Sequence, residues 1–356
     1  MLTNHMMIYF RMFSLLLLIF SIVCAQASDS DVLLPIIQNG KMGFISRRGE
    51  IVIKPQFDTS SYLGVPQLSE FSEGMAAVKS RGVTGYIDTS GQFVIAAQFK
   101  EGGKFCEGLA KVKIGDRWGY INQRGEVVIA PRFKRGGDFS EGVAQVESDG
   151  KLGYIDKTGK FVIEPRFSRP QYPEFVEDGD FKDGVANVRD GAQYLMIDRT
   201  GKTAGKCVFD CLTNFHDGMA LIQGYKKGRP VLGFMDKNGT IAIDPSYDEA
   251  GRFSEGLVQV KYGNLTQQYG WFYIDRTGHQ AIKGTFYFAG SFSEGLAAVA
   301  RDNYLKSGYI DHAGTMIIKA QFDRAGRFQG GVARVLIGNK WGYIDKTGNY
   351  VWEPSK

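Results

Sequence analysis

The stretch WGYIDKTG, residues 341–348, lies near the C-terminal end of the chain, and close copies of it recur upstream. LGYIDKTG ends at Gly159, WGYINQRG at Gly125 and SGYIDHAG at Gly314. A segment that recurs at a regular interval marks a repeat architecture, so the spacing of these copies decides the fold class.

The apolar residue before the recurring acidic position gives the period of the repeat. Its successive copies are 42, 34, 34, 42, 38, 39, 36 and 34 residues apart, so the chain holds nine units with a basic period of 34. The nine anchors are Ile45, Ile87, Ile121, Ile155, Ile197, Met235, Ile274, Ile310 and Ile344. We therefore predict that residues 28–356 form one repeat domain.

Two further motifs complete the unit. FSEGLAAV and its relatives stand once between each pair of anchors, and VIxPxF and its relatives follow each of the first eight anchors. The segments LAKVKI, WGYI and GKFVIEPRF carry apolar, β-branched and aromatic residues in short runs bounded by Gly, as strands do. Each unit is therefore predicted to be a meander of three antiparallel strands.

The recurring acidic residue has the properties of a turn residue. Asp, Asn or Ser at the first position of a type I turn accepts a backbone hydrogen bond, and Gly suits the fourth position. Asn and Ser replace Asp in two copies, and neither can serve as a general base or a carboxylate ligand, which favours a structural role. The predicted turn pairs are Ser46 with Gly49, Asp88 with Gly91, Asn122 with Gly125, Asp156 with Gly159, Asp198 with Gly201, Asp236 with Gly239, Asp275 with Gly278, Asp311 with Gly314 and Asp345 with Gly348.

The motifs WGYIDKTGKFVIEPRF and FSEGLAAV resemble the WG-repeat family of bacterial proteins, and the resemblance extends from about Ile36 to the end of the chain. The Trp-Gly pair itself remains only at Trp118 and Trp341. The resemblance implies a repeat architecture and no single chemistry.

An isolated three-stranded meander cannot cover its own apolar face, so the units must stack on one another. We expect an all-β, open, twisted β-solenoid, because three strands in 34 residues are few for a propeller blade. The last unit also ends near Trp352 without the strand that a closing blade would need. The alternative is a closed, propeller-like ring.

The N-terminal segment is typical of an export signal. A single charge at Arg11 precedes an apolar run from Met12 to Ala25, and AQA at residues 25–27 has small residues at both ends. We expect residues 1–27 to be a cleaved signal peptide and the protein to be exported to the periplasm, the cell surface or the medium. The alternative is a retained membrane anchor, although about twenty apolar residues are usual for a spanning helix.

Charge and cysteine content exclude several classes of partner. The formal net charge is +5 and no long basic run is present, so a nucleic-acid partner has no electrostatic support. After signal cleavage three cysteines remain, of which Cys207 and Cys211 could form a local disulfide if the chain folds back between them. The few histidines keep no ligand spacing with these cysteines, so we expect no metal and no cofactor.

Insertions mark where the repeat tolerates variation. The next FSEG phenylalanine comes fourteen positions after Phe57 and after Phe167, against six positions in the other units, and both long segments carry aromatic residues. Two hairpin turns, after Ile222 and Val260, are also extended and hold aromatic residues beside cations, which can contact sugars or anionic polymers. Tolerated insertion and ordinary solvated hairpin ends are the alternatives. The candidate binding residues are Tyr62, Tyr172, Phe175, Tyr225, Lys226, Lys227, Arg229, Tyr262, Tyr269 and Trp271.

Enzyme signatures are missing from the sequence. It contains no phosphate-binding glycine loop, no GxSxG, no HExxH and no EF-hand loop. We therefore expect an exported, non-catalytic scaffold that binds a protein or a cell-envelope polysaccharide. The alternative is a hydrolase-like enzyme with its site in a groove between repeats or in a propeller mouth.

Overall fold

The structure is a computed structural model that describes residues 33–62, 65–169, 179–191, 193–204, 210–213, 215–262, 270–301 and 306–353. The predicted signal peptide, residues 1–27, lies outside the described residues. Within the described ranges the regular structure is β throughout, and no helix is long and apolar enough to cross a membrane.

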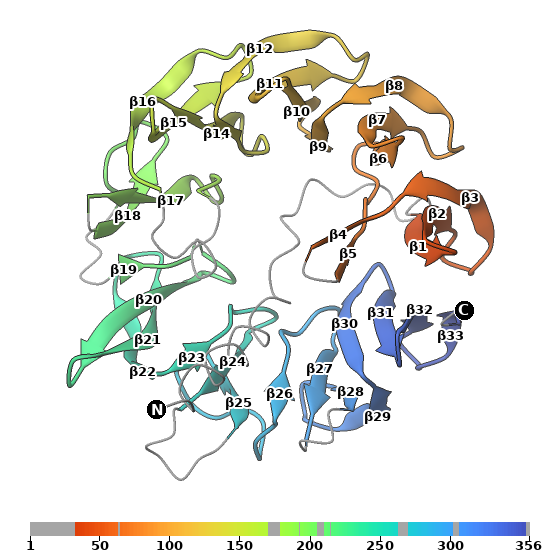
Figure 1. The fold of residues 1–356 in the computed structure, drawn as a ribbon. Coiled ribbons are helices and arrows are strands. Elements are labelled where there is room, and N and C mark those ends of the chain that lie inside the picture. The colour runs from red at the N-terminus through yellow and green to blue at the C-terminus, as the bar shows by residue number, and fades with distance from the viewer. Residues whose placement is uncertain are drawn as a thin grey trace, which may run out of the picture.

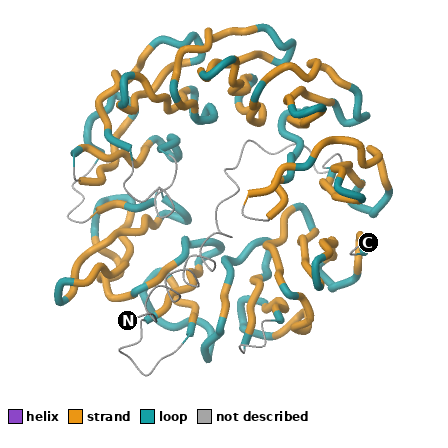
Figure 2. Tube along the Cα trace, viewed as in Figure 1, coloured by secondary structure: helices purple, strands orange, loops and turns teal. Residues whose placement is uncertain are grey.

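The strands form a closed ring of small sheets. Figure 1 shows the sheets following one another around the ring in chain order, so that the first and last of them lie side by side. Figure 2 shows strands and loops alternating around the whole circle. The all-β repeat class is therefore confirmed. The ring is the closed, propeller-like alternative, and the open solenoid was the wrong choice between the two.

The third unit illustrates the blade. Its strands are β9 (Glu101–Cys106), β10 (Leu109–Ile114), β11 (Arg117–Asn122) and β12 (Val127–Phe133), paired in the order β12-β11-β10-β9 and all antiparallel. Strand β12 lies on the outside of the ring and β9 on the inside (Figure 1). Strands β10, β11 and β12 are the three predicted from LAKVKI, WGYIN and VVIAPRF.

Nine blades of two to four strands follow one another in the described residues, and the pairing of Asp58 with Lys79 joins the first two into one six-stranded sheet. The other blades are β1 (Leu34–Gln38), β2 (Lys41–Ile45) and β3 (Ile51–Asp58); β6 (Ala76–Ser80), β7 (Val83–Ile87) and β8 (Phe93–Phe99); β13 (Arg135–Gly136), β14 (Val143–Ser148), β15 (Lys151–Asp156) and β16 (Phe161–Phe167); β17 (Val185–Asp190) and β18 (Gln193–Asp198); β19 (Asp210–Cys211), β20 (Met219–Lys226), β21 (Arg229–Asp236) and β22 (Ile241–Tyr247); β23 (Glu249–Ala250), β24 (Leu257–Lys261) and β25 (Trp271–Asp275); β26 (Phe288–Ala289), β27 (Ala297–Ala300), β28 (Ser307–Ile310) and β29 (Met316–Phe322); and β30 (Arg324–Gln329), β31 (Val332–Ile337), β32 (Lys340–Asp345) and β33 (Tyr350–Trp352). A separate hairpin, β4 (Ser60–Tyr62) with β5 (Val65–Gln67), follows β3.

The inner strand is the part of the blade that the sequence did not predict. It is β9, β13, β19, β23, β26 or β30, and it comes from the segment between the VIxPxF aromatic and the FSEG motif. Most of these strands are only two residues long. With this strand a unit of 34 residues holds four strands, which removes the argument against a propeller.

The core lies between neighbouring blades and not inside each one. Tyr120 of β11 is fully buried, and its ring meets that of Phe139 in the next blade edge-on, with centroids 5.0 Å apart. The hydroxyl of Tyr120 donates a hydrogen bond to the carbonyl oxygen of Gly137, also in the next blade, at 2.9 Å. Ile129 and Phe133 complete one side of the same cluster. A blade is therefore stabilised by its neighbours, as the repeat pattern predicts.

The ends of the ring meet through the same kind of contact. Tyr343 of the last blade donates a hydrogen bond to the carbonyl oxygen of Pro35 in the first blade at 2.8 Å. Leu34, Ile36 and Ile45 pack with Tyr343 in one apolar cluster. Among the described strands, β33 pairs with β32 and β1 with β2, so side-chain packing closes the ring and no strand is shared between the two ends.

Candidate functional site

The antiparallel blades give the ring two different faces. The turns from β9 to β10 and from β11 to β12 lie at one end of the blade, and we call the surface that they form the turn face. The β10–β11 hairpin and the connection from β12 to the next blade lie at the other end, and we call that surface the loop face. The corresponding segments of every blade fall on the same two faces.

On the turn face the recurring acidic residue holds its own turn. The Asp156 carboxylate accepts hydrogen bonds from the backbone N–H of Thr158 at 2.9 Å and of Lys160 at 3.0 Å, and from the Thr158 hydroxyl at 2.6 Å. The pKa of Asp156 lies below its ordinary value, and the hydrogen bond from the Thr158 hydroxyl is the largest cause of this lowering. The same pair of backbone bonds is made by Ser46, Asp88, Asn122, Asp198, Asp236, Asp275, Asp311 and Asp345.

The glycine that ends this turn has a second function. Gly159 has φ +85°, and a Cβ atom built on it would lie 2.9 Å from Cγ2 of Ile129 in the preceding blade. The position therefore needs Gly both for its left-handed backbone and for the close approach of the neighbouring blade. The equivalent pairs are Gly91 with Ile53, Gly125 with Ile95, Gly201 with Ile163, Gly278 with Ile243, Gly314 with Ile282 and Gly348 with Ile318.

The Glu of FSEG joins each blade to the next. Glu107 sits in a two-residue hairpin turn with φ 54°, a left-handed conformation that is unusual for Glu. Its carboxylate accepts a hydrogen bond from the Gly142 N–H at 2.9 Å and lies 3.2 Å from Lys157 Nζ, both in the following blade. Asn or Gly would adopt this left-handed conformation at a lower free-energy cost. The contacts with the next blade explain why the position nevertheless holds an acidic side chain. The signal for them was in the sequence, in the recurring acid of FSEG and the recurring cation after the turn Asp, but it was not recognised.

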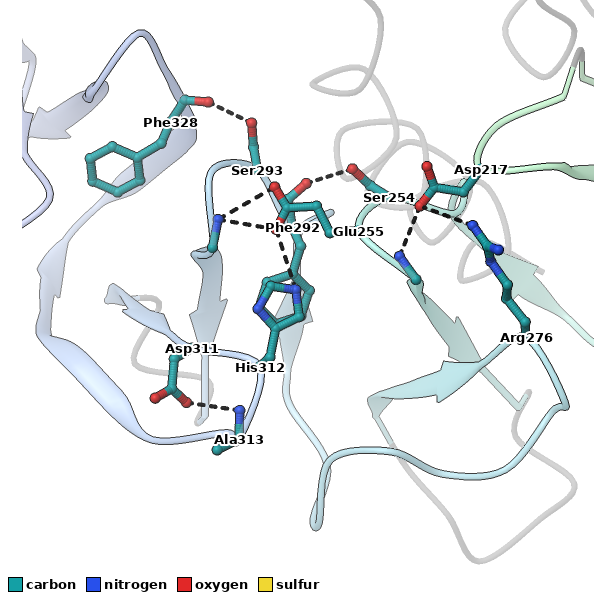
Figure 3. A network of polar contacts seen from close by, with 12 residues as sticks. Asp217, Ser254, Glu255, Arg276, Phe292, Ser293, Asp311, His312, Ala313 and Phe328 are labelled. Carbon is teal, nitrogen blue, oxygen red and sulfur yellow. Dashed lines mark hydrogen bonds and ion pairs between the residues drawn. The ribbon is translucent and has the colours of Figure 1, made fainter.

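This arrangement recurs around the ring as a ladder of carboxylates. Figure 3 shows two steps of it, in which Asp217 contacts Arg276 and Glu255 contacts His312. The other carboxylates are Glu73 with the Gly108 N–H and Gln123, Glu141 with the Gly184 N–H and Arg199, Asp183 with Lys237, and Glu294 with the Gly331 N–H and Lys346. The acidic side chains at the FSEG position are thus occupied in joining blades.

The last unit has Gly330 where the other units have the acid of FSEG. A Cβ atom on Gly330 would lie 2.3 Å from Nη2 of Arg47, which belongs to the first blade. Arg47 follows Ser46 as Lys157 follows Asp156, so it occupies the cation position of the ladder at the point where the ring closes. The last unit thus lacks the acid of the ladder, although Arg47 of the first blade lies beside its position.

The loop face holds the tip of the β20–β21 hairpin and the first of the two long insertions. Tyr225 is 67% exposed at the end of β20, and Lys226, Lys227 and Arg229 are exposed beside it. The first long insertion forms the β4–β5 hairpin, which points toward the middle of the ring in Figure 1. These two regions of the chain were identified separately in the sequence, and the topology places them on one face.

Two of the predicted binding residues have packing roles. Tyr262 is half-buried, with its ring centroid 5.1 Å from that of Tyr247 and 5.4 Å from that of Phe272. Trp271 is half-buried in β25 under Lys261, whose Nζ lies 5.8 Å from the ring centroid. Burial raises the pKa of Tyr247 to about 12. These rings pack at the base of their hairpin and are only partly exposed.

Other predicted residues cannot be placed. Tyr172, Phe175, Tyr269 and Cys207 lie outside the described residues, and Tyr62 and Cys211 lie in strands whose side chains there are not described. Cys106 is buried and disulfide-bonded. In the described part of the chain no three His, Cys, Asp or Glu side chains are grouped so that they could hold a metal ion.

Comparison with known proteins gives a family and a fold. A family model described as "WG containing repeat" matches seven segments, residues 42–83, 85–118, 118–151, 153–194, 233–265, 271–304 and 308–341. No curated protein matches the chain. A solved structure entitled "Crystal structure of the eukaryotic initiation factor" is 11% identical, with 90% of this chain and 95% of that chain covered and a TM-score of 0.61. Kluyveromyces lactis Hsv2 is 10% identical, with 68% and 71% covered and a TM-score of 0.32. The first of these likenesses supports the ring fold and nothing beyond it.

Proposed function

We propose that this chain, which belongs to the family of WG containing repeat proteins, is an exported, non-catalytic scaffold whose loop face binds a protein or glycan partner at the cell envelope. The proposal of export rests on the N-terminal signal pattern, and the proposal of binding rests on the difference between the two faces.

The observation that supports the proposal is that the two faces differ in loop length and in how their polar side chains are paired. On the turn face, lengths are constant and the acidic side chains bind the backbone or the cations of the same or the neighbouring blade. On the loop face, hairpins and connections vary in length, and exposed Tyr, Lys and Arg side chains extend from them. Binding residues commonly lie on variable loops that a rigid scaffold positions, so the loop face is the surface available for a partner.

The experiment uses the mature chain and two matched variants. In the loop-face variant Lys226, Lys227 and Arg229 are each replaced by Gln. In the turn-face variant Arg48, Lys160 and Lys202, three exposed cations, are each replaced by Gln, which removes the same charge from the opposite surface. All three proteins are incubated with purified envelopes of the organism that encodes the chain, and a panel of hydrolase substrates is tested in parallel.

We expect the mature chain and the turn-face variant to be retained on the envelopes, the loop-face variant to be lost from them, and no substrate to be turned over. Equal loss of retention in both variants would contradict a partner site on the loop face. Turnover of a substrate would contradict a non-catalytic scaffold and favour the hydrolase-like alternative.

A further inference from the structure

The β20–β21 hairpin on the loop face has longer strands than the hairpin of the third blade. Strands β20 and β21 have eight residues each, against six in β10 and β11. Two more residues per strand extend the hairpin by about 7 Å at roughly 3.3 Å per residue. Its tip, defined here as residues 225–229, therefore extends further from the blade than the tip of the β10–β11 hairpin does.

The tip contains a pairing that is unfavourable on its own. Lys226 and Arg229 are directly opposite each other in the β20–β21 register, and like charges in that position destabilise a hairpin. The closing pairs of the comparable hairpins hold at most one cation: Gln38 with Lys41, Ser80 with Val83, Ile114 with Arg117, Ser148 with Lys151, Asp190 with Gln193 and Ile337 with Lys340.

Lys227 adds a second local cost. It adopts φ 51°, the left-handed conformation for which Gly, Asn and Asp are preferred. It also adds a third positive charge to a four-residue turn. Three other hairpins on this face place Asn39, Arg81 and Asp149 at the corresponding position, and only that of Arg81 also holds a cation there.

No contact among the described residues offsets these costs. Within the described residues no ion pair joins Lys226, Lys227 or Arg229 to a carboxylate, and all three side chains are exposed. Elsewhere on the loop face such pairs do form, for example between Lys306 Nζ and Asp323 at 2.7 Å. Residues that break local rules without a structural gain are expected at functional sites.

Resting on the proposed function, and specifying its partner, we infer that the tip formed by Tyr225, Lys226, Lys227 and Arg229 binds an anionic polysaccharide. The three cations pair with carboxylate or phosphate groups that recur along the polymer. Tyr225, whose ring is largely exposed, packs against the C–H face of a sugar ring. Each unit of an anionic polysaccharide offers a charged group and an apolar ring face together, which matches this combination better than an acidic peptide does.

The exposure of Lys226, Lys227 and Arg229 also predicts how binding responds to salt. Exposed charges more than about 8 Å apart are screened at physiological ionic strength, so the tip acts through direct contacts. Loss of three exposed ion pairs weakens binding by about tenfold or more. Removal of the opposed cations leaves the melting temperature unchanged or raises it, since the repulsion between Lys226 and Arg229 is relieved.

The experiment measures binding of the mature chain to polygalacturonate, to fully methyl-esterified polygalacturonate and to polyglutamate, at low and high salt. The variants are the loop-face and turn-face triple replacements described above, together with Tyr225→Ser. Melting temperatures are recorded for all of them.

We expect binding to polygalacturonate that weakens with salt, at least tenfold weaker binding by the loop-face variant, about threefold weaker binding by Tyr225→Ser, and no change in the turn-face variant. Binding to the neutral ester should be much weaker. No binding to polygalacturonate, or equal binding by the loop-face variant, would overturn the inference. Polyglutamate bound as tightly, with Tyr225→Ser unchanged, would also overturn it and indicate an acidic protein partner. Retention on envelopes through the loop face without binding to polygalacturonate would reject the polysaccharide inference while leaving the proposed function intact.

Discussion

The hydroxyl of Tyr343 donates a hydrogen bond to the carbonyl oxygen of Pro35 at 2.8 Å, and the two residues are 308 positions apart. The corresponding tyrosines make this bond to the next blade along the chain, as Tyr120 does to Gly137 at 2.9 Å. The last blade therefore packs against the first blade as the other blades pack against the next one in the chain. The acceptor here is in β1, whereas Tyr120 bonds to the segment of the inner strand in the next blade. The hydrogen bond between blades is therefore kept at the closure, with a different acceptor.

Removal of this hydroxyl tests whether the closing contact contributes to stability. Tyr343→Phe keeps the ring in the apolar cluster but leaves the Pro35 carbonyl without this donor. We expect a loss of about 1–2 kcal/mol in the free energy of unfolding, the usual cost of a buried unpaired acceptor. Chemical denaturation measures it, and Tyr120→Phe, which affects an ordinary blade interface, should cost a similar amount. No change for Tyr343→Phe beside a clear loss for Tyr120→Phe would contradict the closing contact.

A glycine at the junction gives a second test. A Cβ atom on Gly49 would lie 2.0 Å from the carbonyl oxygen of Val351 in the last blade, whereas one on Gly40 meets nothing within 4 Å. Both residues have positive φ, +82° and +71°, so both replacements by Ala carry a backbone cost of about 1 kcal/mol. We expect Gly49→Ala to lower the melting temperature well beyond Gly40→Ala. Equal effects would mean that the two ends do not meet.

The carboxylate ladder predicts a stability effect on the turn face. Glu107→Ala removes an acceptor for the Gly142 N–H and a partner for Lys157 in the next blade. We expect a loss of about 1–2 kcal/mol, as for hydrogen bonds to charged groups that are partly exposed. The control is Glu126→Ala, because Glu126 contacts only Asn122 and Arg124 in its own turn and should cost under about 0.5 kcal/mol. Equal losses in the two variants would show that the ladder does not join the blades.

The turn aspartates predict how stability depends on pH. Hydrogen bonds from the hydroxyls of Ser90, Thr158, Thr200 and Thr277 are the largest cause that holds the pKa values of Asp88, Asp156, Asp198 and Asp275 below the ordinary value of 3.8. Because the folded-state pKa is the lower one, the stabilisation is complete above about pH 3.8 and is lost as the pH falls through the folded-state values.

Asp156→Asn tests this dependence, and Asn122 shows that the turn accepts an amide. We expect the variant to be nearly as stable as the parent chain near pH 7 and to lose less stability between pH 5 and pH 2, measured as melting temperature across that range. A steeper acid loss in the variant than in the parent chain would contradict the assignment.

Much of the fold was predictable because the repeat encodes it locally. Type I turn chemistry at Asp156 and Gly159 and the β-branched and aromatic residues of VVIAPRF are short-range signals, and the structure has strands and turns at those positions. The inner strand was missed because segments such as KEGGKFC have no β pattern, and their pairing depends on the next strand. Closure was missed because it follows from the small rotation between successive blades, which the repeat length does not encode.

The candidate site was predictable only in part. The exposed Tyr225 and the cations after it were recognised from their composition in a long hairpin. Tyr262 and Trp271 belong to a similar sequence pattern, but the packing of Tyr247 and Phe272 against Tyr262 buries part of its ring. Aromatic residues near a hairpin tip thus divide into displayed and packed ones according to contacts from other strands, which sequence spacing does not reveal.

The distance between the two ends of the domain in solution tests the closed ring most directly. Spin labels introduced through noncanonical amino acids at the exposed positions Arg48 and Glu353 would flank the contact between Gly49 and Val351. The closed ring predicts a single short distance, at the lower end of the range measurable by pulsed dipolar spectroscopy. An open stack of nine units, with sheets about 10 Å apart, would instead place the labels roughly 80 Å from each other, and that result would contradict the account.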